Sequence, residues 1–114
     1  MLLAVALVAV ATGASAHAFL DHASPAVGST VHGPPPELRI WFTQELELPF
    51  SHVKVEDANG ATVAASEKAV DASDRTLLRM PLPPLAPGKY RVLWHVLSVD
   101  SHVTEGDYTF VVAP

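Results

Sequence analysis

The stretch Lys89 to Ser98, KYRVLWHVLS, decides the fold class of this 114-residue chain. Its apolar side chains recur at every second position, at Tyr90, Val92, Trp94 and Val96. Side chains of a β-strand point alternately to the two faces of a sheet, so this pattern predicts a half-buried strand. The segment 106–113, GDYTFVVA, alternates in the same way and predicts a second strand after a short connection.

Five further short runs predict strands on the N-terminal side, at 18–23, 37–43, 51–56, 61–66 and 75–80. Ten prolines and six glycines interrupt the chain too often for long helices. The dipeptide Asn59-Gly60 predicts a hairpin, whereas 24–36, SPAVGSTVHGPPP, is expected to be a turn-rich connection. About seven short strands predict an all-β fold, a small Greek-key antiparallel β-sandwich of the immunoglobulin-like or cupredoxin-like kind.

The large aromatic residues are interpreted as core rather than as a cage for a ligand. Tyr90, in the sequence APGKY, could also anchor a turn through its hydroxyl, as in the tyrosine corner of sandwich domains. The aromatic residues assigned to the core are Trp41, Phe42, Tyr90, Trp94, Tyr108 and Phe110.

The N-terminal segment resembles an export signal. Residues 2–11, LLAVALVAVA, are apolar throughout but too few to span a bilayer as a helix, and the small residues Ala14-Ser15-Ala16 follow them. This pattern predicts a signal peptide over 1–16, cut after Ala16, and a mature domain over 17–114. No Lys or Arg precedes the apolar run, so we expect a start codon upstream of Met1. A buried N-terminal helix is the alternative, but the run has neither a polar face nor a cap.

Composition narrows the function. The chain has 12 acidic and 7 basic residues and a net charge of −5, and its charges are scattered rather than gathered into a basic stripe. We therefore expect no nucleic-acid partner, and no insertion of the mature chain into a membrane. The chain has no cysteine, so a metal ion would have to be bound by nitrogen and oxygen.

Two groups could supply such ligands. Cleavage after Ala16 would give His17 a free α-amine, and the amine and ring nitrogens of one residue can chelate Cu(II), which favours tetragonal nitrogen and oxygen sites. The alternative is that His17 only marks the cleavage point. Asp100 and His102 stand two residues apart, so in an extended segment their side chains point the same way. The alternative is a turn that begins at Asp100 and a solvated His102.

The other four histidines are interpreted as exposed or hydrogen-bonded structural residues. His95 follows Trp94 and is expected to face away from the core. His22 stays open as a further ligand, although its odd spacing from His17 places the two on opposite sides of a straight strand. The remaining histidines of this group are His32 and His52.

The chain resembles the CopC family of periplasmic copper-binding proteins. The resemblance rests on HAFLDHASPAVGS at 17–29, the ELRIWFT strand, the Leu-x-Pro-Gly-x-Tyr turn and the block from Trp94 to Gly106, Trp-x3-Ser-x-Asp-x-His-x3-Gly. It implies a small Greek-key sandwich with one Cu(II) ion bound by His17, Asp100 and His102. Some members also have a methionine-rich Cu(I) site. Here the methionines are Met1 and Met80, so no such site is expected.

The resemblance implies a non-enzymatic carrier or buffer of Cu(II) in the periplasm, with a role in copper homeostasis or resistance. Its partner would be an inner-membrane copper transporter or another periplasmic copper protein. One alternative is a copper monooxygenase with a histidine-brace site, in which Asp100 would crowd the open coordination position. The other is a metal-free β-sandwich interaction module whose histidines are incidental.

Overall fold

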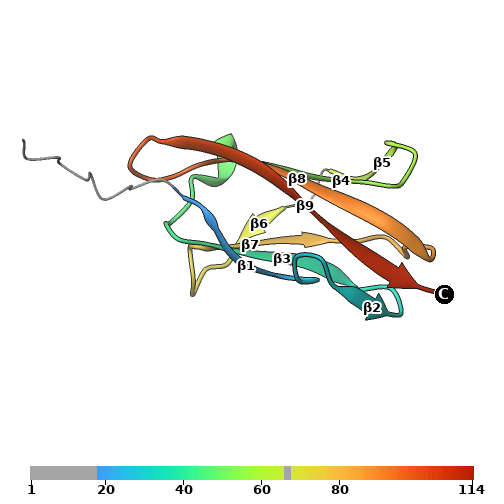
Figure 1. Cartoon of the computed structure of the whole chain (residues 1–114). Helices are drawn as coiled ribbons and strands as arrows, with labels where there is room; N and C mark the ends of the chain where they lie inside the picture. Colours follow the sequence, from blue (N-terminus) through green and yellow to red (C-terminus); the bar gives the residue numbers. More distant parts are fainter. Residues whose placement is uncertain (1–17, 66–67) are drawn as a thin grey trace, which may run out of the picture.

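The computed structural model describes residues 18–65 and 68–114, and these form two β-sheets that face each other (Figure 1). The first sheet has the strand order β1-β3-β7-β6, and the second has the order β2-β9-β8-β4-β5. The strands of the first sheet are β1 (Leu20–Ser24), β3 (Glu37–Phe42), β7 (Leu77–Pro81) and β6 (Ala69–Val70). Those of the second are β2 (Thr30–His32), β9 (Val103–Ala113), β8 (Gly88–Leu97), β4 (His52–Glu56) and β5 (Thr62–Ala64), and a 3-10 turn, η1 (Leu48–Phe50), precedes β4.

The prediction of an all-β sandwich is confirmed, with nine strands in the described residues where about seven were expected. One of the additional strands, β2, lies inside the segment 24–36 that was predicted to be only a connection. It pairs with β9 in parallel, with Thr30 opposite Val111, so the sandwich is not antiparallel throughout. The other, β6, is a two-residue strand at the edge of the first sheet.

The predicted hairpin at Asn59-Gly60 joins β4 to β5. The carboxylate of Asp57 accepts hydrogen bonds from the backbone N–H groups of Asn59 and Ala61, at 2.9 and 3.0 Å. Gly60 has a φ of +80°, which a residue without a Cβ adopts at little cost. An Asp side chain and a glycine therefore close this turn between them.

The core lies between the sheets and follows the two-residue period of the sequence. Leu38, Ile40 and Phe42 face it from β3, and Tyr108, Phe110 and Val112 face it from β9. Burying an aliphatic or aromatic side chain of this size stabilises the fold by roughly 1.5–3 kcal/mol. The hydroxyl of Tyr90 donates a 2.6 Å hydrogen bond to the carbonyl of Ala86, which confirms the expected turn anchor.

The assignment of Trp41 to the core was wrong. Trp41 is half-buried, because Leu38, Ile40 and Phe42 occupy the inward positions of β3 and Trp41 falls between them. Its indole instead stacks on the imidazole of His22 from β1, with ring centroids 4.3 Å apart and planes 10° apart. The size of the indole favours burial, whereas the alternation of side chains along β3 places Trp41 on the outer face of the sheet.

The predicted signal peptide and His17 lie outside the described residues. Within the described ranges, no helix is long and apolar enough to cross a membrane.

Candidate metal centre

A tight turn joins the two longest strands, β8 and β9. The backbone N–H of Ser98 donates to the carbonyl of His102 at 3.0 Å, and the N–H of Ser101 donates to the carbonyl of Ser98 at 2.9 Å. Ser101 has a left-handed φ of +70°, an uncommon conformation for a residue with a side chain. The turn brings residues 98 and 102 close together and leaves the side chains between them at the end of the sandwich.

The turn places Asp100 and His102 beside each other, as predicted from their spacing. The Nδ1 atom of His102 lies 3.3 Å from Oδ2 of Asp100, and the two side chains are 48% and 33% exposed. The prediction assumed an extended segment, whereas the structure achieves the contact through a turn. An imidazole nitrogen and a carboxylate oxygen at the surface form a donor pair that suits Cu(II).

The hydroxyl of Ser98 is hydrogen-bonded to both residues of this pair. Ser98 is fully buried, its Oγ donates to Oδ1 of Asp100, and the same Oγ accepts from the backbone N–H of His102 at 3.3 Å. The hydrogen bond from Ser98 is the main cause that lowers the pKa of Asp100, with a smaller effect from His102, and partial desolvation opposes both. The lowered pKa favours the ionised carboxylate, which is the form that binds a metal ion.

Ser98 belongs to the motif from Trp94 to Gly106, but the sequence analysis predicts no role for its hydroxyl. The sequence feature that could have indicated this role is the Ser-x-Asp spacing at the end of the alternating segment 89–98. A hydroxyl two residues before a carboxylate is well placed to donate to it when the chain turns.

The chain enters the described part of the structure beside this turn. Ala18 is fully buried, and its carbonyl accepts a hydrogen bond from the hydroxyl of Thr104, two residues beyond His102. The next residue is also held, because the N–H of Phe19 donates to Oγ1 of Thr43 at 2.9 Å. Figure 1 shows the start of β1 at the same end of the molecule as the β8–β9 connection. Ala18, the residue bonded directly to His17, is therefore held against β9 at the end that adjoins the turn.

The remaining histidines lie elsewhere on the sandwich. His22 stacks on Trp41, and its Nδ1 lies 2.7 Å from Oδ2 of Asp21. An irregularity in the pairing of β1 with β3 makes Asp21 an additional residue between Leu20 and His22. His32 is exposed on β2 at the edge of the second sheet. The expectation that His95 faces away from the core is confirmed.

Asp100 and His102, two of the three predicted ligands, lie side by side in the structure. In residues 18–65 and 68–114, no group of three or more His, Asp or Glu side chains is assembled to hold a metal ion. The third predicted ligand, His17, lies outside these ranges. Met80 is 1% exposed and belongs to the core.

Comparison with known proteins identifies the family. The CopC domain matches residues 20–113. Protein YobA of Escherichia coli K12 is 37% identical over 98 residues, which cover 85% of this chain and 79% of YobA. Copper resistance protein C of Escherichia coli is 31% identical over 110 residues, covering 90% of this chain and 86% of that protein.

Solved structures agree with the sequence match. The crystal structure of CopC from Methylosinus trichosporium OB3b has a TM-score of 0.82 and 34% identity, and the match covers 86% of this chain and 95% of that one. PcoC, a methionine-rich copper resistance protein from Escherichia coli, has a TM-score of 0.73 and 31% identity, with coverage of 85% and 99%. The chain therefore belongs to the CopC family.

Proposed function

We propose that the chain binds one Cu(II) ion through His17, Asp100 and His102 and serves in the periplasm as a carrier or buffer of copper. The proposal includes removal of residues 1–16 by cleavage after Ala16. The observation that carries it is the hydrogen bond from Thr104 to the carbonyl of Ala18, because it ties the residue after His17 to a strand position two residues beyond His102.

The donor chemistry supports Cu(II). Cleavage would give His17 an α-amine and a ring nitrogen that chelate one ion, to which the turn adds a carboxylate oxygen and a second imidazole. Three nitrogens and one oxygen are a donor set that suits Cu(II) in tetragonal geometry. The names of relatives point the same way, since they include copper resistance protein C and the copper transport protein CutJ of Bacillus subtilis.

A carrier is favoured over an enzyme by the exposure of the ligands. Asp100 and His102 are accessible from solvent, so a second protein can reach the ion and take it by ligand exchange. The partner would be an inner-membrane copper transporter or another periplasmic copper protein. Copper-loaded protein incubated with polysaccharide, a reductant and an oxidant should release no oxidised sugars, and such products would establish a monooxygenase instead.

The decisive experiment compares two forms of the chain, one that begins at His17 and one that keeps Ala16. The form that begins at His17 should bind Cu(II) far more tightly in a competition titration, because an amide nitrogen is a poorer donor than a free amine. Its affinity should fall as the pH drops below about 8, where the α-amine becomes protonated. Equal affinities of the two forms would remove His17 from the site.

Two substitutions in the form that begins at His17 complete the test. His102→Ala should weaken Cu(II) binding strongly, and His32→Ala, on the far edge strand, should leave it unchanged. A greater loss with His32→Ala would show that the ion lies elsewhere.

A further inference from the structure

Two histidines and a glutamate lie in a row across the outer face of the second sheet. His52 on β4 is directly opposite His95 on β8, and His95 is directly opposite Glu105 on β9. Residues paired in this way across neighbouring strands project from the same face, with Cβ atoms about 5 Å apart. All three are exposed, so they form a continuous row across three strands.

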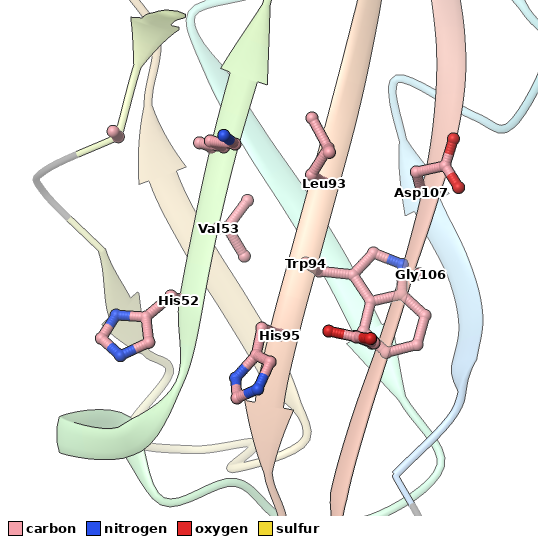
Figure 2. Close-up of a pocket in the computed structure, with 10 residues that line it drawn as sticks. His52, Val53, Leu93, Trp94, His95, Gly106 and Asp107 are labelled. Carbon is pink, nitrogen blue, oxygen red and sulfur yellow. The ribbon is translucent and has the colours of Figure 1, made fainter.

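The two imidazoles are already close to each other. Their ring centroids are 6.4 Å apart and the planes are tilted by 35°, and Figure 2 shows them side by side on adjacent strands. A metal ion bonded to both imidazoles would lie about 2.0–2.1 Å from each nitrogen, which in tetrahedral geometry brings the ring centres to roughly 5 Å apart, about 1 Å closer than they are here. The three side chains do not yet converge, but exposed rings can rotate about χ1 and χ2 at small cost.

The charged residues next to the row on this face form ion pairs with one another. His52, His95 and Glu105 form none within the described part of the chain. Lys54 lies 3.6 Å from the carboxylate of Glu56, and Arg91 lies 2.8 Å from that of Asp107. In the described ranges no ion pair or hydrogen bond engages the side chains of the row. Its two imidazoles and one carboxylate are therefore available to an ion without breaking an existing contact.

The row also borders an open hollow on this face of the sheet. The hollow has a volume of about 610 Å³, and its lining includes His52, His95 and Glu105 from the row and Leu93 between them. Figure 2 shows His52, Leu93 and His95 on the two adjacent strands. Two imidazoles and a carboxylate suit borderline divalent ions such as Zn(II). The hollow leaves room for the water molecules that would complete the coordination of such an ion.

We propose that His52, His95 and Glu105 form a second metal site, which binds a divalent ion of the Zn(II) type on the outer face of the second sheet. This site is separate from the candidate centre at His102. That centre lies in the connection beyond the ends of β8 and β9, whereas the row lies within the strands. The proposal does not depend on cleavage after Ala16, because all three ligands belong to the folded sandwich.

The test is a Zn²⁺ titration of the full chain, prepared without a histidine tag, against the variants His52→Gln and His95→Gln. Each variant keeps a polar side chain of similar size at an exposed position, so the fold should persist, as circular dichroism can verify. Loss of one imidazole should raise the Kd of the Zn²⁺ ion bound at this site about tenfold or more, which corresponds to at least about 1.4 kcal/mol of binding free energy. Glu105→Gln should also raise this Kd, and an unchanged affinity would overturn the assignment of the carboxylate.

His32→Gln is the matched control, because it removes one exposed imidazole away from both the row and the candidate centre. It should retain the Zn²⁺ ion bound at the row, and NMR should show the ring resonances of His52 and His95 shifting together as Zn²⁺ is added. Wild-type affinity in His52→Gln and His95→Gln would overturn the site. So would an equal loss in His32→Gln, because binding would then be distributed over the surface histidines.

Discussion

The hydroxyl of Ser98 stabilises the ionised form of Asp100 through a hydrogen bond. Ser98→Ala removes the hydrogen bond that contributes most to lowering the pKa of Asp100, so this pKa should rise toward its ordinary value. Carbon-detected NMR of the Asp100 carboxyl in the metal-free protein would measure the shift. Because outer-shell partners orient and charge a ligand, Cu(II) affinity should also fall, by roughly 10- to 100-fold.

Ser51→Ala is a matched control for this substitution. Ser51 is also fully buried, and its hydroxyl also bonds to backbone groups near the end of β8, at Glu47 and Leu97. It makes no contact with Asp100, so Ser51→Ala should leave the titration of that carboxyl unchanged. An equal shift in both variants would show that the change comes from general loosening of the turn.

The indole of Trp94 leaves no space for a side chain at Gly106, and this lack of space, rather than the backbone conformation, requires a glycine there. The two residues are paired across β8 and β9, and a Cβ built on Gly106 would lie 2.5 Å from Cζ2 of Trp94 (Figure 2). Trp94 cannot simply move away, because its ring packs edge-on against Phe42 at 5.3 Å. Gly106→Ala should therefore destabilise the fold by about 1–3 kcal/mol in urea unfolding.

A double-mutant cycle tests the cause. Trp94→Phe provides a smaller ring, so Gly106→Ala should cost less in that background than in the wild type. Additive losses of unfolding free energy in the double variant would mean that Gly106 is needed for a reason other than the space taken by the indole of Trp94.

At the level of elements, an ion-pair network ties together the outer face of the first sheet. Arg79 on β7 donates to Glu37 on β3 at 2.8 Å and to Asp71, which follows β6, at 3.2 Å. The pKa of Asp71 is lowered from 3.8 to about 2, chiefly by hydrogen bonds from Ser73 and also by Arg79. The pKa of Glu37 is lowered as well, first by Arg79 and then by Arg39.

The sign of the pH dependence follows from these directions. A carboxyl whose pKa is lower in the folded state than in the unfolded state stabilises the fold at a pH where it is ionised in both. This stabilisation is lost as the pH falls and the carboxyl becomes protonated. For Asp71 that loss should occur between pH 3.8 and about 2. Asp71→Asn should be less stable than the wild type at pH 7, and the two should converge near pH 2 in thermal unfolding. A difference that stays constant down to that pH would contradict an electrostatic origin.

The elements also show how far the sequence predicts the structure. Strict alternation was sufficient for β3, β8 and β9, because a sandwich buries one face of each strand. It could not reveal β2, whose three residues pair in parallel with a distant strand and have no pattern of their own. The proximity of Asp100 and His102 was predicted from an extended segment, but a turn produces it. The position of Ala18 beside Thr104 is a contact between residues 86 positions apart. Such contacts follow from the fold and not from local sequence.

For the whole molecule, the candidate centre lies where the two sheets meet. Ala18 leads into β1 of the first sheet, and the Asp100–His102 turn belongs to the second, so an ion bound by His17 and by the turn would link them. An ion that binds only the folded state stabilises it by about 2.7 kcal/mol at 100 times its Kd. Cu(II) should therefore raise the Tm of the form that begins at His17, and His102→Ala should abolish most of the increase.

A link between the sheets should also act locally, which distinguishes it from simple stabilisation by mass action. The N–H of Thr43 donates to the carbonyl of Phe19 at 2.8 Å, so it reports on the attachment of the N-terminal segment. The N–H of Val111, which donates to Ser29 at 2.9 Å near the other end of β9, is the control. Hydrogen exchange should slow more at Thr43 than at Val111 when Cu(II) binds, because opening near Ala18 would then require release of the ion. Equal protection at both amides would mean that the ion stabilises the sandwich without joining its sheets.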